Sequence, residues 1–198
     1  MATTEASRVV PELEHAPLLA AREWLDQDAI VGLERTWTWR QVHQASIELA
    51  GRLGHASAVC NLCNSRLNFL VTWLAALRCR TPMVLPPSGG HADLAGVLES
   101  TPRPVIVVDH EEAVQPGWRD SADCLVAPST GPSAKAGAPD PTWLPDWHCT
   151  AALLYTSGST GAPEPHPKTL FQLVSGALAL GERLAQEVAG GLSAIRRL

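Results

Sequence analysis

Four hydroxyl-bearing residues and two glycines follow one another at positions 156–161, between an apolar run and an amphipathic stretch. Glycine lets a backbone turn tightly and bring its N–H groups close to a ligand, and consecutive amides in such a turn form a concavity that binds anions. Hydroxyl groups add donors around the same oxygens, and a lysine shortly afterwards adds a positive charge. The pattern predicts a phosphate-binding loop formed by Thr156, Ser157, Gly158, Ser159, Thr160 and Gly161, with Lys168 beyond it.

Ordinary loop composition is the alternative explanation of this segment, because serine, threonine and glycine are common in loops of every kind. Two other motifs are excluded by their spacing. The Walker loop requires Gly-x-x-x-x-Gly-Lys-Ser/Thr, which Gly158 and Gly161 do not supply. The nucleophile elbow of hydrolases requires Gly-x-Ser-x-Gly, and neither Ser157 nor Ser159 stands inside such a pattern.

The elements that would position this loop alternate between short apolar runs and helical stretches. Apolar residues recur at helical spacing between Thr38, a candidate N-cap, and Gly54, a candidate helix stop. Asn64 or Ser65 is a candidate cap for the next helix. Strands are predicted at residues 36–39, 58–62, 81–85, 104–108 and 151–155, with helices at 67–77, around 94–98 and at 170–184. This order predicts an α/β fold in which a parallel sheet is covered by helices.

The chain divides into four segments by composition. Residues 1–28 are predicted to be an N-terminal extension with a helix, and residues 29–110 an α/β subdomain. Residues 111–147 are rich in proline, glycine and serine and are predicted to be a loop or linker. Its three tryptophans favour docking of parts of it onto the domain. Residues 148–198 are predicted to form a strand, the phosphate loop and a helix closed by a pair of glycines, Gly190 and Gly191.

The overall composition is typical of a folded protein, with 45% hydrophobic and 18% charged residues. The formal net charge of −5 argues against a nucleic-acid partner. The longest apolar stretch, residues 69–77, is far shorter than the ~20 residues of a membrane span. The first residues also lack the pattern of a secretory signal. A cytoplasmic location without a membrane span is therefore expected.

Five cysteines are present, and Cys60 and Cys63 have the spacing of half a zinc site. No second pair of cysteines or histidines completes such a site in the sequence, so no metal ligand is assigned. Buried free thiols are the favoured interpretation, because free cysteine packs like a small apolar residue. A redox pair is the alternative.

The longer segment Leu154-Tyr155-Thr-Ser-Gly-Ser-Thr-Gly161-x-Pro163 resembles the signature phosphate loop of the adenylate-forming superfamily. That superfamily includes acyl-CoA synthetases, aryl-acid ligases and the adenylation domains of peptide synthetases. Residues 36–42 are similar to its Thr-Tyr-x-Glu-Leu entry, residues 68–77 to its buried helix, and residues 94–109 to its Val-Ile-Val-Asp unit. The resemblance covers roughly residues 29–186, the N-terminal part of the family's large domain.

The resemblance implies an activity and its cofactors. Members join a carboxylic acid to ATP, release pyrophosphate, and pass the acyl group from the adenylate to a thiol of CoA or of a carrier protein. The six loop residues would hold the β- and γ-phosphates, with Lys168 close by, and Mg²⁺ would accompany the nucleotide. The implied partners are a carboxylic acid and CoA or an acyl carrier protein.

Two departures from the family pattern bear on these expectations. The family places a lysine where this chain has Glu164, and the lysine here arrives four residues later as Lys168. His166, between two prolines, is interpreted as a turn residue or, alternatively, as a phosphate contact. The family's later adenine, ribose and lysine motifs do not occur in the chain, so no catalytic residue is assigned and the chain alone is expected to be inactive.

Two further expectations follow from the missing motifs. A non-enzymatic homologue, which binds nucleotide weakly or supports a partner chain, is the alternative function. The apolar stretches at residues 67–77 and 170–184 predict uncovered surface and self-association or a partner chain.

Overall fold

The computed structural model describes residues 24–32, 36–86, 91–128, 138–140, 142–156 and 164–195. Most of the predicted N-terminal extension and residues 157–161 of the predicted phosphate loop lie outside these ranges. The described residues begin with a small antiparallel pair, β1 (Asp28–Val31) and β2 (Thr36–Thr38).

Within the described residues, six strands form one sheet in the order β6-β5-β3-β4-β7-β8. The first five of these are mutually parallel, and β8 pairs antiparallel with β7. This confirms the predicted α/β fold with a mainly parallel sheet. The strands are β3 (Ala58–Asn61), β4 (Met83–Leu85), β5 (Pro104–Val108), β6 (Asp123–Val126), β7 (Thr150–Thr156) and β8 (Glu164–Thr169).

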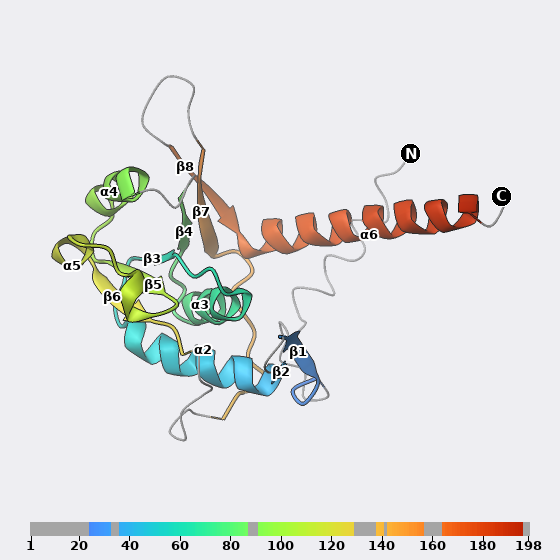
Figure 1. Cartoon of the computed structure of the whole chain (residues 1–198), viewed down its shortest axis with the longest axis horizontal. Helices are drawn as coiled ribbons and strands as arrows, with labels where there is room; N and C mark the ends of the chain where they lie inside the picture. The colour runs from blue at the N-terminus through green and yellow to red at the C-terminus, as the bar shows by residue number, and fades with distance from the viewer. Residues whose placement is uncertain are drawn as a thin grey trace.

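Helices cover both faces of this sheet (Figure 1). The helices α2 (Trp39–Leu53) and α3 (Arg66–Arg78) pack on one face, against Val59, Val105 and Val107. On the other face, α4 (His91–Ser100) and the short α5 (Trp118–Ser121) pack against Ala58, Cys60 and Ile106. Successive residues of β3 and β5 thus enter two different cores, which explains why these strands are continuous apolar runs and not alternating ones.

The helix boundaries follow the capping signals in the sequence. The Thr38 hydroxyl accepts a hydrogen bond from the Gln41 backbone N–H, and the Gln41 side chain accepts one from the Thr38 N–H. This reciprocal arrangement satisfies two of the N–H groups that a helix start leaves without partners. At the other end of α2, Gly54 has a φ of 58°, a conformation that glycine adopts at little cost. Ser65, one of the two predicted caps, caps α3.

Residues 111–147, predicted to be a loop or linker, contain regular structure. The 3₁₀ turn η1 (Glu111–Ala113), α5 and β6 all fall inside this segment, and β6 is the strand at one edge of the sheet. The prediction missed β6 because Asp123 and Cys124 interrupt its apolar pattern, and an edge strand tolerates such residues. The expected docking of Trp118 and Trp147 is confirmed, because both are buried.

The helix α6 (Leu170–Ile195) extends away from the body of the molecule (Figure 1). It continues through Gly190 and Gly191, so the prediction that this pair ends the helix was wrong. Glycine inside a helix costs only about 1 kcal/mol. Leu178, Leu180 and Leu184 of this helix are exposed. None of the described helices is both long enough and apolar enough to cross a membrane.

The stretch at residues 67–77 was predicted to lack cover, and the structure corrects this. It forms most of α3, whose residues Val71, Leu74, Ala75 and Ala76 are fully buried. The cover comes from α2 and from the sheet, all within the described residues. Of the two stretches predicted to be uncovered, the one in α6 has exposed leucines among the described residues.

The contact between α2 and the core leads to a stability prediction. Leu49 of α2 is fully buried, whereas Leu180 of α6 is 58% exposed. Leu49→Ala is expected to lower the free energy of unfolding by about 2–5 kcal/mol, because it removes buried carbons and leaves a cavity. The matched control Leu180→Ala is expected to change it by less than about 0.5 kcal/mol. Urea denaturation followed by circular dichroism measures both, and equal losses would contradict the position of Leu49 in the core.

Candidate functional site

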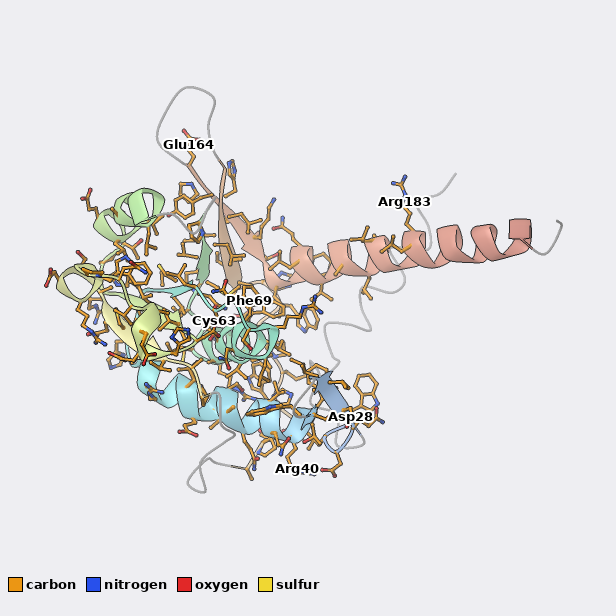
Figure 2. All side chains as sticks on the ribbon, in the orientation of Figure 1. Asp28, Arg40, Cys63, Phe69, Glu164 and Arg183 are labelled. Carbon is orange, nitrogen blue, oxygen red and sulfur yellow. The ribbon has the colours of Figure 1, made fainter. Side chains whose placement is uncertain are left out.

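The hairpin of β7 and β8 carries the predicted phosphate loop. β7 ends at Thr156 and β8 begins at Glu164, so residues 157–163 connect the two strands. Because β7 is parallel to β4, Thr156 lies on the side of the sheet formed by the carboxyl ends of the parallel strands. Open α/β sheets bind their ligands on this side. Figure 2 shows Glu164 at the end of the hairpin, away from the helices α2 and α3.

A strand intervenes between the predicted loop and the helix, where the sequence predicted a direct strand–loop–helix unit. β8 was missed because Pro165 and Pro167 occupy it, and proline normally argues against a strand. Both prolines lie in the outermost strand of the sheet as the structure describes it. An edge strand can hold proline wherever the missing N–H would face outward.

The register of the hairpin places the residues that follow the loop. Thr156 pairs with Glu164, Leu154 with His166, and Ala152 with Lys168. Residues 164, 166 and 168 therefore share one face of β8. His166 lies within a strand, so its interpretation as a turn residue was wrong.

Lys168 is separated from the end of β7 along the strand. Its partner Ala152 precedes Thr156 by four residues, which corresponds to roughly 13 Å of strand. The structure thus brings Thr156 next to Glu164 and does not bring it next to Lys168. The assignment of Lys168 and of the loop residues to phosphate binding stays a prediction.

A carboxylate accepts several hydrogen bonds near the carboxyl ends of β3 and β5. Asp109 follows β5 directly, and its Oδ2 accepts hydrogen bonds from the backbone N–H groups of Asn64 at 2.7 Å and Ser65 at 3.2 Å. Its Oδ1 accepts a third from Asn68 Nδ2 at 2.8 Å. A negative charge is favourable at the start of a helix, so Asp109 fixes the start of α3 to the end of β5.

The segment that precedes β7 contacts the helices α2 and α3. The Arg78 guanidinium lies 4.1 Å from the centre of the Trp143 ring. Its Nη2 lies 2.9 Å from His43 Nδ1, and its Nε donates to Ser46 Oγ at 3.0 Å. Burial lowers the pKa of Arg78 to about 10, with the charge of Asp140 acting in the opposite direction. Arg78 nevertheless remains a cation at neutral pH and holds Trp143 by a cation–π contact.

The five cysteines are all free thiols. Burial raises the pKa of Cys60 and of Cys63 to about 12, and for Cys63 the nearby Asp109 adds to this effect. Burial is also the main cause of the smaller increases in pKa at Cys79, Cys124 and Cys149. Among the described residues, no group of three or more His, Cys, Asp or Glu side chains gathers in a way that could hold a metal ion.

Comparison with known proteins identifies the family. Residues 19–190 match the family described as AMP-binding enzyme. The chain belongs to this family of adenylate-forming enzymes, as its phosphate-loop motif predicted. Because the match extends over most of the sequence, it does not depend on the loop alone.

Relatives and solved structures agree with this assignment. A Mycobacterium tuberculosis protein named "Putative fatty-acid--CoA ligase fadD25" is 28% identical over 156 residues, which are 67% of this chain and 25% of that protein. The O-succinylbenzoate coenzyme A synthetase of Bacillus subtilis, solved with AMP, is 20% identical with a TM-score of 0.60 over 79% of this chain and 34% of its own. ATP-bound MatB from Rhodopseudomonas palustris is 21% identical with a TM-score of 0.53 over 75% of this chain and 32% of its own.

The chain corresponds to only part of each relative. The chain spans about a quarter of the length of the curated relative and about a third of the length of the solved ones. At identities this low, the structural likeness shows the fold.

The raised thiol pKa values lead to a reactivity prediction. At pH 8, a thiol with a pKa of about 12 is a thiolate in only roughly one molecule in ten thousand. Cys60 and Cys63 are therefore expected to stay unmodified by iodoacetamide in the native protein, while Cys79, Cys124 and Cys149 react earlier. Mass spectrometry of tryptic peptides locates the label. Denatured protein is the control, in which all five cysteines should react. Rapid labelling of native Cys60 or Cys63 would favour the redox pair instead.

Proposed function

We propose that this chain supplies the phosphate-binding part of an ATP-dependent carboxylic acid ligase. The proposed reaction joins a carboxylic acid to ATP as an acyl-adenylate and then transfers the acyl group to a thiol. The observation that carries the proposal is the hairpin of β7 and β8 at the carboxyl edge of the sheet. Its connection contains the Ser/Thr/Gly motif of the family to which the chain belongs.

The loop residues are proposed to bind ATP through its β- and γ-phosphates. Thr156, Ser157, Gly158, Ser159, Thr160 and Gly161 provide hydroxyl and backbone donors for this purpose. Support for nucleotide binding comes from the solved relatives, one of which holds ATP and another AMP. Lys168 is proposed to add a positive charge, with His166, which lies nearer to the end of the hairpin, as the next candidate.

Magnesium is proposed to arrive with the nucleotide. Mg²⁺ in nucleotide sites is typically held by one or two carboxylates together with the phosphates. Glu164 fits this role, because it is exposed and pairs with Thr156 at the end of the hairpin. Beside a phosphate loop, a carboxylate repels the nucleotide unless a cation lies between them. The ion would neutralise charge on the phosphates when it is bound.

The substrate class is proposed only as a carboxylic acid, with CoA or an acyl carrier protein as the thiol partner. The names of the relatives support this class, since one is named a fatty-acid–CoA ligase and another a coenzyme A synthetase. A non-enzymatic homologue that supports a partner chain is the second candidate. The exposed leucines of α6 favour an association of this kind.

Nucleotide binding provides the first test of the proposal. Lys168→Ala is expected to weaken binding of Mg·ATP by about 1–3 kcal/mol, the range for one charge-assisted contact. Lys135→Ala is the matched control, because the sequence contains no other lysine, and it should leave binding unchanged. Isothermal titration calorimetry measures both. Equal binding by both variants would remove Lys168 from the site, and His166→Ala would then be tested in the same way.

Catalysis by the chain alone provides the second test. No ATP–pyrophosphate exchange is expected from the 198 residues with any aliphatic or aromatic acid. Alignment of the reacting groups supplies ~7–11 kcal/mol of such a barrier, and the chain covers only about a third of the solved relatives. A full-length ligase of the family serves as the positive control. Sedimentation analysis in the same buffer tests self-association through α6. Robust exchange from a stable monomer would contradict both expectations.

A further inference from the structure

A cleft of about 510 Å³ lies at the amino ends of the parallel strands, whereas Thr156, where the predicted phosphate loop begins, lies at their carboxyl ends. Its lining comes from the end of α2, from residues 54–56 just before β3, from the start of β5, and from α5 and the start of β6. All these residues stand at the amino ends of parallel strands, whereas Thr156 stands at a carboxyl end. Figure 1 shows α5, β6 and the end of α2 together on the side of the molecule away from β8 and α6.

Arginines from three separate elements line this cleft. Arg52 is in the last turn of α2, Arg103 directly precedes β5, and Arg119 belongs to α5. Arg119 pairs with Glu111, and Arg52 donates one Nη1 hydrogen bond to the carbonyl oxygen of Val126 at 2.9 Å. Within the described residues, the Arg103 side chain makes no hydrogen bond or ion pair. Arg103 and the remaining donors of Arg52 are thus open to a ligand.

The backbone holds Arg103 at the cleft in an uncommon conformation. Arg103 has a φ of 47°, a left-handed value that is unfavourable for residues other than glycine. The turn is fixed by Ser57, whose N–H donates to the Arg103 carbonyl at 3.3 Å and whose hydroxyl donates to the carbonyl of Pro102. Pro104 on the other side has a fixed φ. The guanidinium is therefore presented from a rigid turn.

Carboxylates line the same cleft. Asp120 and Asp123 stand on the side of α5 and β6, and no ion pair joins either of them to the three arginines among the described residues. Because Arg119 is already paired with Glu111, Arg52 and Arg103 stand against Asp120 and Asp123, and these groups together carry no net charge. A bare anion gains little from such a mixed lining. A ligand that carries one anionic group and several hydroxyl groups satisfies both kinds of side chain.

We propose that this cleft binds a small phosphate monoester that carries hydroxyl groups, such as a sugar or polyol phosphate. The phosphate lies against Arg103 and Arg52, because guanidinium groups bind phosphate oxygens in a bidentate manner. Hydroxyl groups of the ligand donate to Asp120 and Asp123. The volume suits a ligand of this size and is larger than phosphate alone requires. The site is independent of the proposed nucleotide loop.

Titration calorimetry at fixed ionic strength tests the proposal with glucose 6-phosphate, inorganic phosphate and glucose as probes of the full chain. Glucose 6-phosphate is expected to bind saturably and more tightly than inorganic phosphate, and glucose is expected not to bind. Absence of saturable binding by either phosphate would overturn the site. Equal binding of the two phosphates would overturn the role of Asp120 and Asp123.

The variant Arg103→Gly removes the guanidinium and suits the backbone, because glycine is favourable at a φ of 47°. It is expected to weaken binding of glucose 6-phosphate roughly tenfold without lowering the thermal unfolding temperature. Arg66→Gln, an exposed arginine outside the cleft, is the control and should bind normally. Unchanged binding by Arg103→Gly would overturn the proposal.

A loop variant separates this site from the nucleotide site. Ser157→Ala is expected to leave the binding of glucose 6-phosphate unchanged, whatever it does to ATP. Loss of sugar-phosphate binding in Ser157→Ala would place the ligand at the loop and overturn the assignment to the cleft.

Discussion

The common direction of five strands is the constraint on which the arrangement of the protein depends. Five strands run parallel: β6, β5, β3, β4 and β7. Their carboxyl ends therefore all lie on one side of the sheet, and their amino ends lie on the opposite side. Asp109 and Thr156 consequently both lie at the carboxyl ends of the strands, although they are far apart in the sequence. The arginine cleft forms at the amino ends for the same reason. Two chemically different surfaces thus follow from strand polarity alone.

The antiparallel strand β8 is the outermost strand on its side of the described sheet, and its prolines limit further pairing there. Pro165 and Pro167 pair with Tyr155 and Leu153, while His166 and Lys168 pair with Leu154 and Ala152. Because proline lacks an N–H, the positions that face outward on this strand offer no donors to another strand. The residues between the prolines keep their N–H groups for β7. This alternation allows a proline-rich sequence to serve as an edge strand. Because β8 runs antiparallel to β7, it also returns the chain to the side of the sheet where α6 begins.

The sequence predicted the strands that form apolar runs and missed the two edge strands β6 and β8. β3 and β5 are buried at every position and were found as apolar runs, and the caps Thr38, Ser65 and Gly54 marked the helix ends. β6 and β8 are edge strands, where aspartate and proline are tolerated, so no periodic signal distinguishes them from loops. The loop motif itself is local and could be identified from consecutive residues. The arginine cleft could not, because Arg52, Arg103 and Arg119 come together only through the fold.

The connection between β6 and β7 has to cross the sheet, because β5, β3 and β4 separate the two strands. A crossing of this length positions β7 only if it is held at points along its course. Trp147 is buried in the core, and its carbonyl oxygen accepts a hydrogen bond from the Phe171 N–H at 2.9 Å. Trp143 lies against Arg78 of α3, whose guanidinium also contacts His43 of α2. The entry to β7 is therefore fixed to both helices and to the start of α6, so the position of Thr156 depends on aromatic contacts made well before the loop begins.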